Sequence, residues 1–262
     1  MRKIKKGIYF ILSYFGIYPR QFFTNLKFLG GYFSDLRNFK SSFGSKYTDW
    51  KFRYYPILMD KTDQSGKARG QYFYQDLYVA NKIFENNPVK HVDIGSRIDG
   101  FVTHVASYRK IEVYDIRPLD SDIINVNFVQ ADLMNPNENL KEVTDSLSCL
   151  HTIEHFGLGR YGDPIDIDGH IKGLDQMFHI LKRGGIFYFS TQIGPNTLAF
   201  NAHRIFSVRY LLNLFEDKYD LLSFSYIDDK DKFHAEVAIT ENDINSNFGC
   251  KMGCGIFILR KK

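Results

Sequence analysis

Cysteine is scarce in this sequence and occurs only at positions 149, 250 and 254 of 262. Three cysteines form neither an even set for disulfides nor the two closely spaced pairs of a zinc knuckle. A disulfide scaffold is therefore disfavoured, and the cysteine content is typical of a reducing compartment. We expect a cytoplasmic protein.

A long apolar run is also missing. Basic residues from Arg2 to Lys6 precede a short apolar run at 8–12, which is the order found in a signal peptide. However, aromatic residues and Arg20 stand where small residues of a cleavage site would be, and the run is well short of the roughly 20 residues that span a bilayer. We expect neither secretion nor a transmembrane segment.

Negative charge is nearly absent from the first 40 residues. Eight lysines and arginines there face a single acid, Asp35, and they are interspersed with Phe and Tyr. Two interpretations stand for residues 1–45. They form an amphipathic anchor that holds the protein at the inner face of a membrane, or a helical cap that packs on its own domain or on a subunit partner. The net charge of +4 is mild, and we expect no nucleic-acid partner.

A polar stretch at 60–70 with two glycines predicts the division of the chain. Residues 1–70 are expected to form a basic aromatic extension and a loop, and residues 71–262 one domain. From position 89 strand-like and helix-like segments alternate, which predicts an α/β fold with a parallel sheet covered on both faces. The predicted strands are 91–94, 111–115, 127–130, 146–150, 186–190, 219–226 and 255–260, and the predicted helices 71–85, 100–109, 171–181 and 206–215.

Carboxylates follow two of these strands. In a doubly wound sheet, ligands bind beyond the carboxyl ends of the strands. Asp115 ends the second strand, about 20 residues after the first glycine turn, where a carboxylate can accept hydrogen bonds from both hydroxyls of a ribose. Asp132 follows the third strand, where a second carboxylate can accept from the amino group of an adenine. Two acids so placed favour a nucleoside site, although Asp115 alone is equally typical of a strand-end turn or a helix cap.

Five segments together resemble the class I S-adenosylmethionine-dependent methyltransferases. They are Asp93-Ile94-Gly95-Ser96, Val113-Tyr114-Asp115, Gln130-Ala131-Asp132, residues 145–156, and Leu181-Lys182-Arg183-Gly184-Gly185. The resemblance implies a Rossmann-like class I methyltransferase fold, with a seven-stranded, mostly parallel sheet, an antiparallel last strand and a helical N-terminal extension. It also implies S-adenosylmethionine as cofactor and S-adenosylhomocysteine as product. The residues that would hold this cofactor are Asp93, Gly95, Ser96, Arg97, Asp115, Ile116, Asp132 and Leu133.

Residues 93–101 and 153–164 more narrowly resemble an uncharacterised methyltransferase-like family that is often associated with bacterial surface-glycan biosynthesis. This resemblance implies O-methylation of a sugar or nucleotide-linked sugar in a capsule or lipopolysaccharide pathway. Two alternatives stand beside it. The acceptor is a phosphorylated or amino-bearing metabolite, or the chain is a non-catalytic scaffold for glycan assembly at a membrane, in which case it has no need of both Asp115 and Asp132.

The glycine turn departs from the usual pattern. Three alternating glycines are expected after the acid, whereas Gly95 is followed by Arg97, Asp99 and then Gly100. The full turn of nicotinamide dehydrogenases is therefore missing, and a redox role is disfavoured. Either the Arg97 guanidinium meets an anion, such as the methionine carboxylate or a nucleotide-linked acceptor, or it pairs with Asp99.

Histidine and arginine residues supply the candidates for acceptor chemistry. His151 follows the fourth strand directly, where a histidine can act as the base that removes a hydroxyl proton or can shape the methionine pocket. Acceptor binding is expected from His155, Arg160, Tyr161, His203 and Arg204. Arg204 could instead pair with an acid beneath a helix capped by Ser207. No ligand spacing indicates a metal, and we expect none.

Overall fold

The structure is a computed structural model that describes residues 12–66 and 68–262. The chain divides into two compact units, residues 1–67 and residues 68–262. In the described part of the chain, none of the helices is both long and apolar enough to cross a bilayer.

The described part of the first unit is built on the 28-residue helix α2, Pro19–Lys46. Proline at the first helical position favours this start, because its fixed φ suits a helix and its missing N–H would have had no partner. Near the C-terminal end of α2, Phe43 contacts the rings of Phe52 and Trp50 in the segment that follows the helix. The centroids lie 5.1 and 6.5 Å apart, respectively. An ion pair of 2.5 Å between Lys61 and Asp35 joins the short 3-10 helix Asp60–Thr62 to α2.

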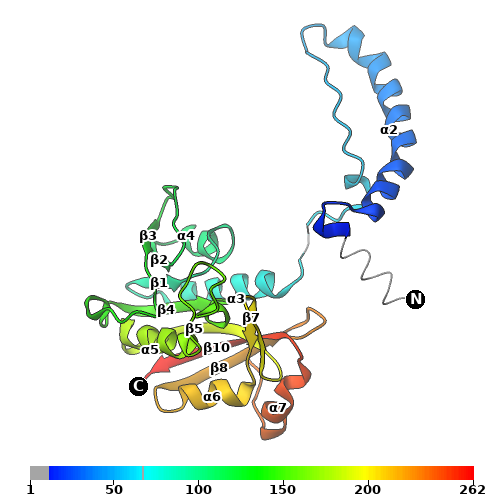
Figure 1. Cartoon of the computed structure of the whole chain (residues 1–262). Coiled ribbons are helices and arrows are strands. Elements are labelled where there is room, and N and C mark those ends of the chain that lie inside the picture. Colours follow the sequence, from blue (N-terminus) through cyan, green and yellow to red (C-terminus); the bar gives the residue numbers. More distant parts are fainter. Residues whose placement is uncertain (1–11, 67) are drawn as a thin grey trace. The chain divides into compact units, whose positions relative to one another are not determined.

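The second unit is organised around one eight-stranded sheet with the order β3-β2-β1-β4-β5-β10-β8-β9 (Figure 1). The strands are β1 His91–Ile94, β2 Ile111–Asp115, β3 Val126–Gln130, β4 Thr144–Leu150, β5 Leu181–Ile193, β8 Tyr219–Ile227, β9 Phe233–His234 and β10 Gly253–Lys261. The first five strands are parallel, and β10 lies antiparallel between β5 and β8. The expected mostly parallel sheet with an antiparallel last strand is confirmed, and the two-residue β9 adds an eighth strand at the edge. A separate hairpin pairs β6, Thr197–Ala199, with β7, His203–Ile205.

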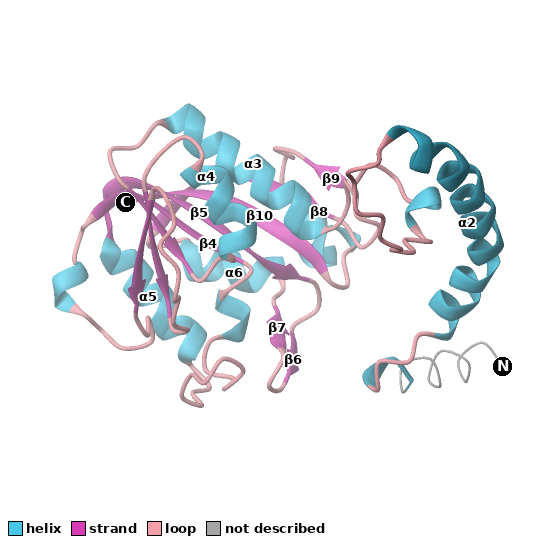
Figure 2. Cartoon of the chain, turned by 90° about the horizontal axis from the view of Figure 1, so that it is seen from above, coloured by secondary structure: helices cyan, strands magenta, loops and turns pink. Residues whose placement is uncertain are grey.

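Helices cover both faces of the sheet (Figure 2). They are α3 Gln71–Asn86, α4 Thr103–Ala106, α5 Gly169–Ile180, α6 Val208–Phe215 and α7 Glu241–Ser246. Successive residues of β10 show how the two cores form, since Phe257 packs in the α5 and α6 core, whereas Ile256 and Ile258 pack in the α3 and α4 core.

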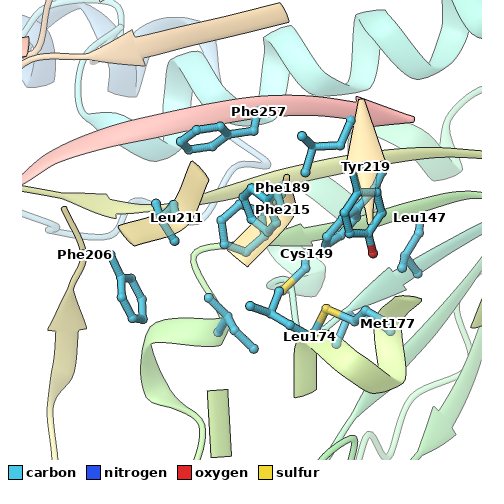
Figure 3. Packing of buried hydrophobic residues seen from close by; sticks show 14 of the residues in the cluster. Leu147, Cys149, Leu174, Met177, Phe189, Phe206, Leu211, Phe215, Tyr219 and Phe257 are labelled. Atoms are coloured by element: carbon cyan, nitrogen blue, oxygen red, sulfur yellow. The ribbon is translucent and has the colours of Figure 1, made fainter. Parts of the chain in front are cut away.

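Figure 3 shows Phe257, Phe189 and Phe215 packed together in the α5 and α6 core. The Phe189 ring lies 5.2 Å from that of Phe215 and 6.0 Å from that of Phe257. Burying each such side chain stabilises the fold by about 1.5–3 kcal/mol.

The crossover after β1 differs from the expected helix at 100–109. A π-helical segment, Ile98–Val102, leads instead into α4, which is only four residues long. Gly100 lies so close to α3 that an added Cβ would stand 2.9 Å from a carboxylate oxygen of Asp76. The side chains of Thr103 and His104 both hydrogen-bond to the Gly100 carbonyl, at 2.8 Å each. The prediction of a regular ten-residue helix was wrong, because this turn follows contacts with a distant helix.

Candidate functional site

A cavity of about 470 Å³ opens at the carboxyl ends of β1, β2 and β4 in the second unit. Its volume lies within the range of roughly 300–1,000 Å³ typical of small-molecule sites. The structure brings eleven of the residues predicted from sequence together in its lining: Gly95, Ser96, Arg97, Asp115, Ile116, Asp132, Leu133, His151, His155, Arg160 and Tyr161.

Asp93 lies behind the cavity rather than in its lining. Its buried carboxylate accepts hydrogen bonds from the backbone N–H of Ser96 at 3.0 Å, the Ser96 hydroxyl at 2.8 Å, and the Ser148 hydroxyl. Burial raises the pKa of Asp93 to about 7, against the opposing effect of these hydrogen bonds. Its oxygens hold the turn after β1 to β4, and contact between Asp93 and a cofactor stays a prediction.

Gly95 brings the same turn against the chain after β4. It has φ of +70°, a conformation that side chains other than glycine adopt at a cost. An added Cβ would lie 2.3 Å from Cγ2 of Thr152. The positive φ and the close approach of the turn to the Thr152 side chain therefore favour glycine at this position.

Arg97 pairs with Asp99 in the structure. Its guanidinium forms a two-point pair with the Asp99 carboxylate, at 2.9 and 2.6 Å. Both side chains are exposed, so the internal pair is the arrangement present and Arg97 still borders the cavity.

Asp115 is held by an arginine that the sequence analysis did not select. Arg117 donates from Nε to Oδ1 at 3.0 Å, from Nη2 to Oδ2 at 2.5 Å, and from its backbone N–H to Oδ1 at 2.8 Å. The Arg117 guanidinium also lies 4.5 Å from the centroid of the Tyr161 ring. The signal was present in the sequence, since an arginine two residues beyond a strand-end acid can reach both of its oxygens.

Asp132 shapes the turn after β3. Its Oδ1 accepts from the backbone N–H of Met134 at 2.9 Å, and its Oδ2 accepts from the Asn135 amide at 2.7 Å. Each carboxylate oxygen has two lone-pair sites, so acceptor capacity is left for a ligand in the cavity beside the apolar Ile116 and Leu133.

His151 and Glu154 form a buried pair at the floor of the cavity, where each side chain is 1% exposed. Nδ1 of His151 lies 2.8 Å from Oε1 of Glu154, whose Oε2 accepts from the Thr191 hydroxyl at 3.0 Å. Within the described part of the chain, Nε2 of His151 is buried with no hydrogen-bond partner. His151 has φ of +50°, so its backbone is held in a strained conformation.

Charge on the histidine follows from this pairing. Burial lowers the pKa of His151, but the neighbouring Cys254 and the Glu154 carboxylate raise it, and the pKa ends well above its ordinary value. Burial has the opposite effect on Glu154 and raises its pKa. The contacts with His151 outweigh this effect, so the pKa of Glu154 is lowered. Each group therefore stabilises the charged form of the other.

Arg204 supports the loop at 157–168 from outside the cavity. Its guanidinium donates to the backbone carbonyls of Phe156 at 2.6 Å and Ile167 at 3.2 Å, which lie at the two ends of the loop. Neither Arg204 nor His203 is among the residues that line the cavity. Two of the Arg204 nitrogens donate to backbone carbonyls, and acceptor binding by Arg204 and His203 stays a prediction.

His155, Arg160 and Tyr161 reach the cavity from the segment that follows β4. Nδ1 of His155 donates to the Ala202 carbonyl at 2.6 Å, and burial lowers the pKa of this histidine. The loop acids serve the loop itself, since Asp163 accepts from the backbone N–H groups of Gly159 and Tyr161 at 3.1 Å each. Residues 12–66 and 68–262 contain no cluster of three or more His, Cys, Asp or Glu arranged to hold a metal ion.

Comparisons with known proteins relate this geometry to a family and a fold. A family model matches residues 106–261, and its description is "Caenorhabditis protein of unknown function, DUF268". No curated protein matches the chain. The narrower resemblance to a bacterial surface-glycan family is therefore not what the matching family model describes.

Two solved structures establish the fold. The chain is similar to the cyclase SpnF, with a TM-score of 0.52 and 13% identity over 75% of this chain and 85% of that chain. It is also similar to the Burkholderia thailandensis 1,6-didemethyltoxoflavin-N1-methyltransferase, solved with S-adenosylhomocysteine and 1,6-didemethyltoxoflavin. That TM-score is 0.51, with 14% identity over 89% of this chain and 90% of the other. The two names differ in chemistry, so the fold alone does not assign an activity.

Proposed function

Because the chain belongs to the family described as "Caenorhabditis protein of unknown function, DUF268", whose description names no activity, we propose from its cavity that it is an S-adenosylmethionine-dependent methyltransferase. The observation that carries the proposal is the convergence of Asp115, Asp132 and the Gly95 turn on one cavity. The Burkholderia thailandensis methyltransferase of similar fold is solved with S-adenosylhomocysteine, which supports the same cofactor here.

The lining suits this cofactor chemically. Asp115 and Asp132 would accept hydrogen bonds from ribose hydroxyls and from an adenine amino group, and Ile116 and Leu133 would contact the base. Asp93 supports this site indirectly, because its hydrogen bonds hold Ser96 and the turn in place. When bound, S-adenosylmethionine supplies an electrophilic methyl carbon on a sulfonium.

His151 is the candidate base for a hydroxyl acceptor. Glu154 holds its Nδ1, so that Nε2 is the nitrogen left to take a proton. The raised pKa of His151 means that the base form increases as the pH rises, and turnover should therefore increase toward alkaline pH. An amino-bearing acceptor would place less demand on this residue, because an amine can lose its proton to solvent after transfer.

The acceptor in this proposal is a sugar or a nucleotide-linked sugar, with a role in surface polysaccharide synthesis that rests on the sequence resemblance alone. Calorimetry with S-adenosylhomocysteine tests the cofactor site. A mass-resolved activity screen of S-adenosylmethionine with nucleotide-linked sugars, phosphorylated metabolites and amines then tests the acceptor. Absence of S-adenosylhomocysteine binding to the full chain would reject the methyltransferase assignment and favour the scaffold alternative.

We place the protein in the cytoplasm, with peripheral contact between residues 1–45 and an anionic membrane as part of the same proposal. The supporting observation is that Phe22, Phe23 and Phe33 of α2 are 60, 68 and 55% exposed on a helix that also carries lysine and arginine. Co-sedimentation of the full chain with phosphatidylserine vesicles should be lost when these three residues are changed to serine. Phe84→Ser removes an equally exposed phenylalanine from the second unit as a control, and equal loss in both variants would reject the contact.

A further inference from the structure

The mouth of the cavity carries three arginines, and one of them is not neutralised. Arg97 pairs with Asp99, and Arg117 pairs with Asp115. Arg160 makes no ion pair with a carboxylate in the part of the chain that the structure describes. Its polar contacts involve one nitrogen, Nη1, which donates to the Ala202 carbonyl at 3.0 Å and lies 3.4 Å from Nδ1 of His155. A guanidinium has five N–H donors, so most of those of Arg160 remain for a ligand.

The segment that carries Arg160 is held in place before any ligand arrives. The N–H of Asp166 donates to the Gly157 carbonyl at 3.0 Å and closes the base of the loop. Gly157 has φ of +74°, and an added Cβ would lie 2.0 Å from the Asp166 carbonyl oxygen. Arg204 and Asp163 bind further backbone groups of this loop. Such preorganisation reduces the entropy lost when a ligand is bound.

Two of the arginines contact the ring of Tyr161. Its ring centroid lies 5.2 Å from the Arg160 guanidinium and 4.5 Å from that of Arg117. The two guanidinium carbons are therefore at most about 10 Å apart, which is within the span of a diphosphate contacted at each end at about 2.8 Å. Asp115 pairs with Arg117, and the nearby Asp163 carboxylate accepts from the backbone N–H groups of Gly159 and Tyr161, so neither acid forms an ion pair with Arg160.

We propose that Arg160, assisted by Arg117 across Tyr161, is a phosphate-binding site for the acceptor. Arginine matches phosphate with paired N–H donors, and a diphosphate is long enough to reach both guanidinium groups, whereas a single carboxylate is not. The acceptor class is thus a phosphorylated or diphosphate-linked small molecule rather than a neutral one. The proposal rests on the methyltransferase function, because it places the acceptor in the same cavity as the cofactor.

Calorimetric titration of the full chain with inorganic pyrophosphate tests this site, with and without saturating S-adenosylhomocysteine. Wild type should bind pyrophosphate with an affinity that falls as sodium chloride is raised. Arg160→Gln should bind at least tenfold more weakly and keep wild-type affinity for S-adenosylhomocysteine, which shows that it is folded. Arg183→Gln removes the same charge from an exposed position at the start of β5, outside the cavity, and should bind pyrophosphate as wild type does.

Equal pyrophosphate binding by wild type and Arg160→Gln, or no binding by wild type, would overturn the proposal. Malonate binding as tight as pyrophosphate would overturn the phosphate assignment in favour of a carboxylate. If S-adenosylhomocysteine fails to bind but pyrophosphate binding still depends on Arg160, the anion site stands and the methyltransferase function fails.

Discussion

Arg117 occupies both carboxylate oxygens of Asp115 at the carboxyl end of β2. Asp115 is also the residue best placed to accept hydrogen bonds from a ribose. In the proposed function, the Arg117 guanidinium and the ribose hydroxyls would compete for the same carboxylate, and this competition can be measured.

Asp115→Ala should weaken S-adenosylhomocysteine binding at least tenfold, or by about 1.4 kcal/mol, as measured by calorimetry. Arg117→Gln should leave the affinity unchanged or raise it several-fold, because it frees the carboxylate. Asp220→Ala is the matched control, since Asp220 pairs with Arg260 at an exposed position outside the cavity. Loss of affinity in Arg117→Gln as large as in Asp115→Ala would mean that the ion pair itself, and not the carboxylate, binds the ligand.

His151→Gln should lower turnover by about 100-fold or more and change S-adenosylhomocysteine affinity less than threefold. Glu154→Gln tests the positioning role, because loss of the carboxylate removes an interaction that raises the pKa of His151. The rise of turnover with pH should therefore move to lower pH in this variant. An unchanged pH profile in Glu154→Gln, or normal turnover in His151→Gln, would transfer the role of base to another group; His179→Gln on α5 provides the control.

Stability should depend on pH through His91, which is buried between the hydroxyls of Ser146 and Ser148 at 2.8 and 3.1 Å. Burial is the main cause that lowers its pKa from 6.5 to about 3. The unfolded chain therefore takes up the proton first, so the contribution is complete above pH 6.5 and is lost as the pH falls from there towards 3.

Urea unfolding at pH 7.5 and pH 5 should show wild type losing about 2 kcal/mol more than His91→Gln over this interval. His104→Gln, at an exposed position, should lose as much as wild type. The same loss in wild type and His91→Gln would show that another group controls acid sensitivity in this range.

Gly95→Ala and Gly184→Ala separate backbone strain from close packing. Both glycines have positive φ, +70° and +77°, but only Gly95 has an atom in the way of a Cβ, whereas nothing lies within 4 Å at Gly184. Each variant should lose about 1–2 kcal/mol from the backbone, and Gly95→Ala a further 1–3 kcal/mol from overpacking, measured by urea unfolding. Thr152→Ser removes the clashing Cγ2 and should restore part of the second loss; equal losses at the two glycines would refute the packing argument.

Element type could be predicted because it depends on local patterns. β1 and β2 have the bounds expected from sequence, at 91–94 and 111–115, and α3 differs from the expected 71–85 by one residue. The crossover after β1 could not be predicted, because its path depends on Asp76, which lies 24 positions before Gly100 in the chain. The role of Arg204 could not be predicted either. It donates to the carbonyls of Phe156 and Ile167, which lie nearly 40 residues or more before it in the chain, and no local pattern indicates these contacts.

The sequence by itself determined the α/β class, the order of strands along the chain, and the presence of acids after β2 and β3, because hydrophobic periodicity and strand-end residues are local properties. Tertiary structure decided what those acids and their neighbours do. It placed Arg117 on Asp115, Glu154 and Cys254 beside His151, and Arg160 against Tyr161. Hydrogen bonding and charge at these groups depend on distances of a few ångströms between segments far apart in sequence, and only the folded chain sets those distances.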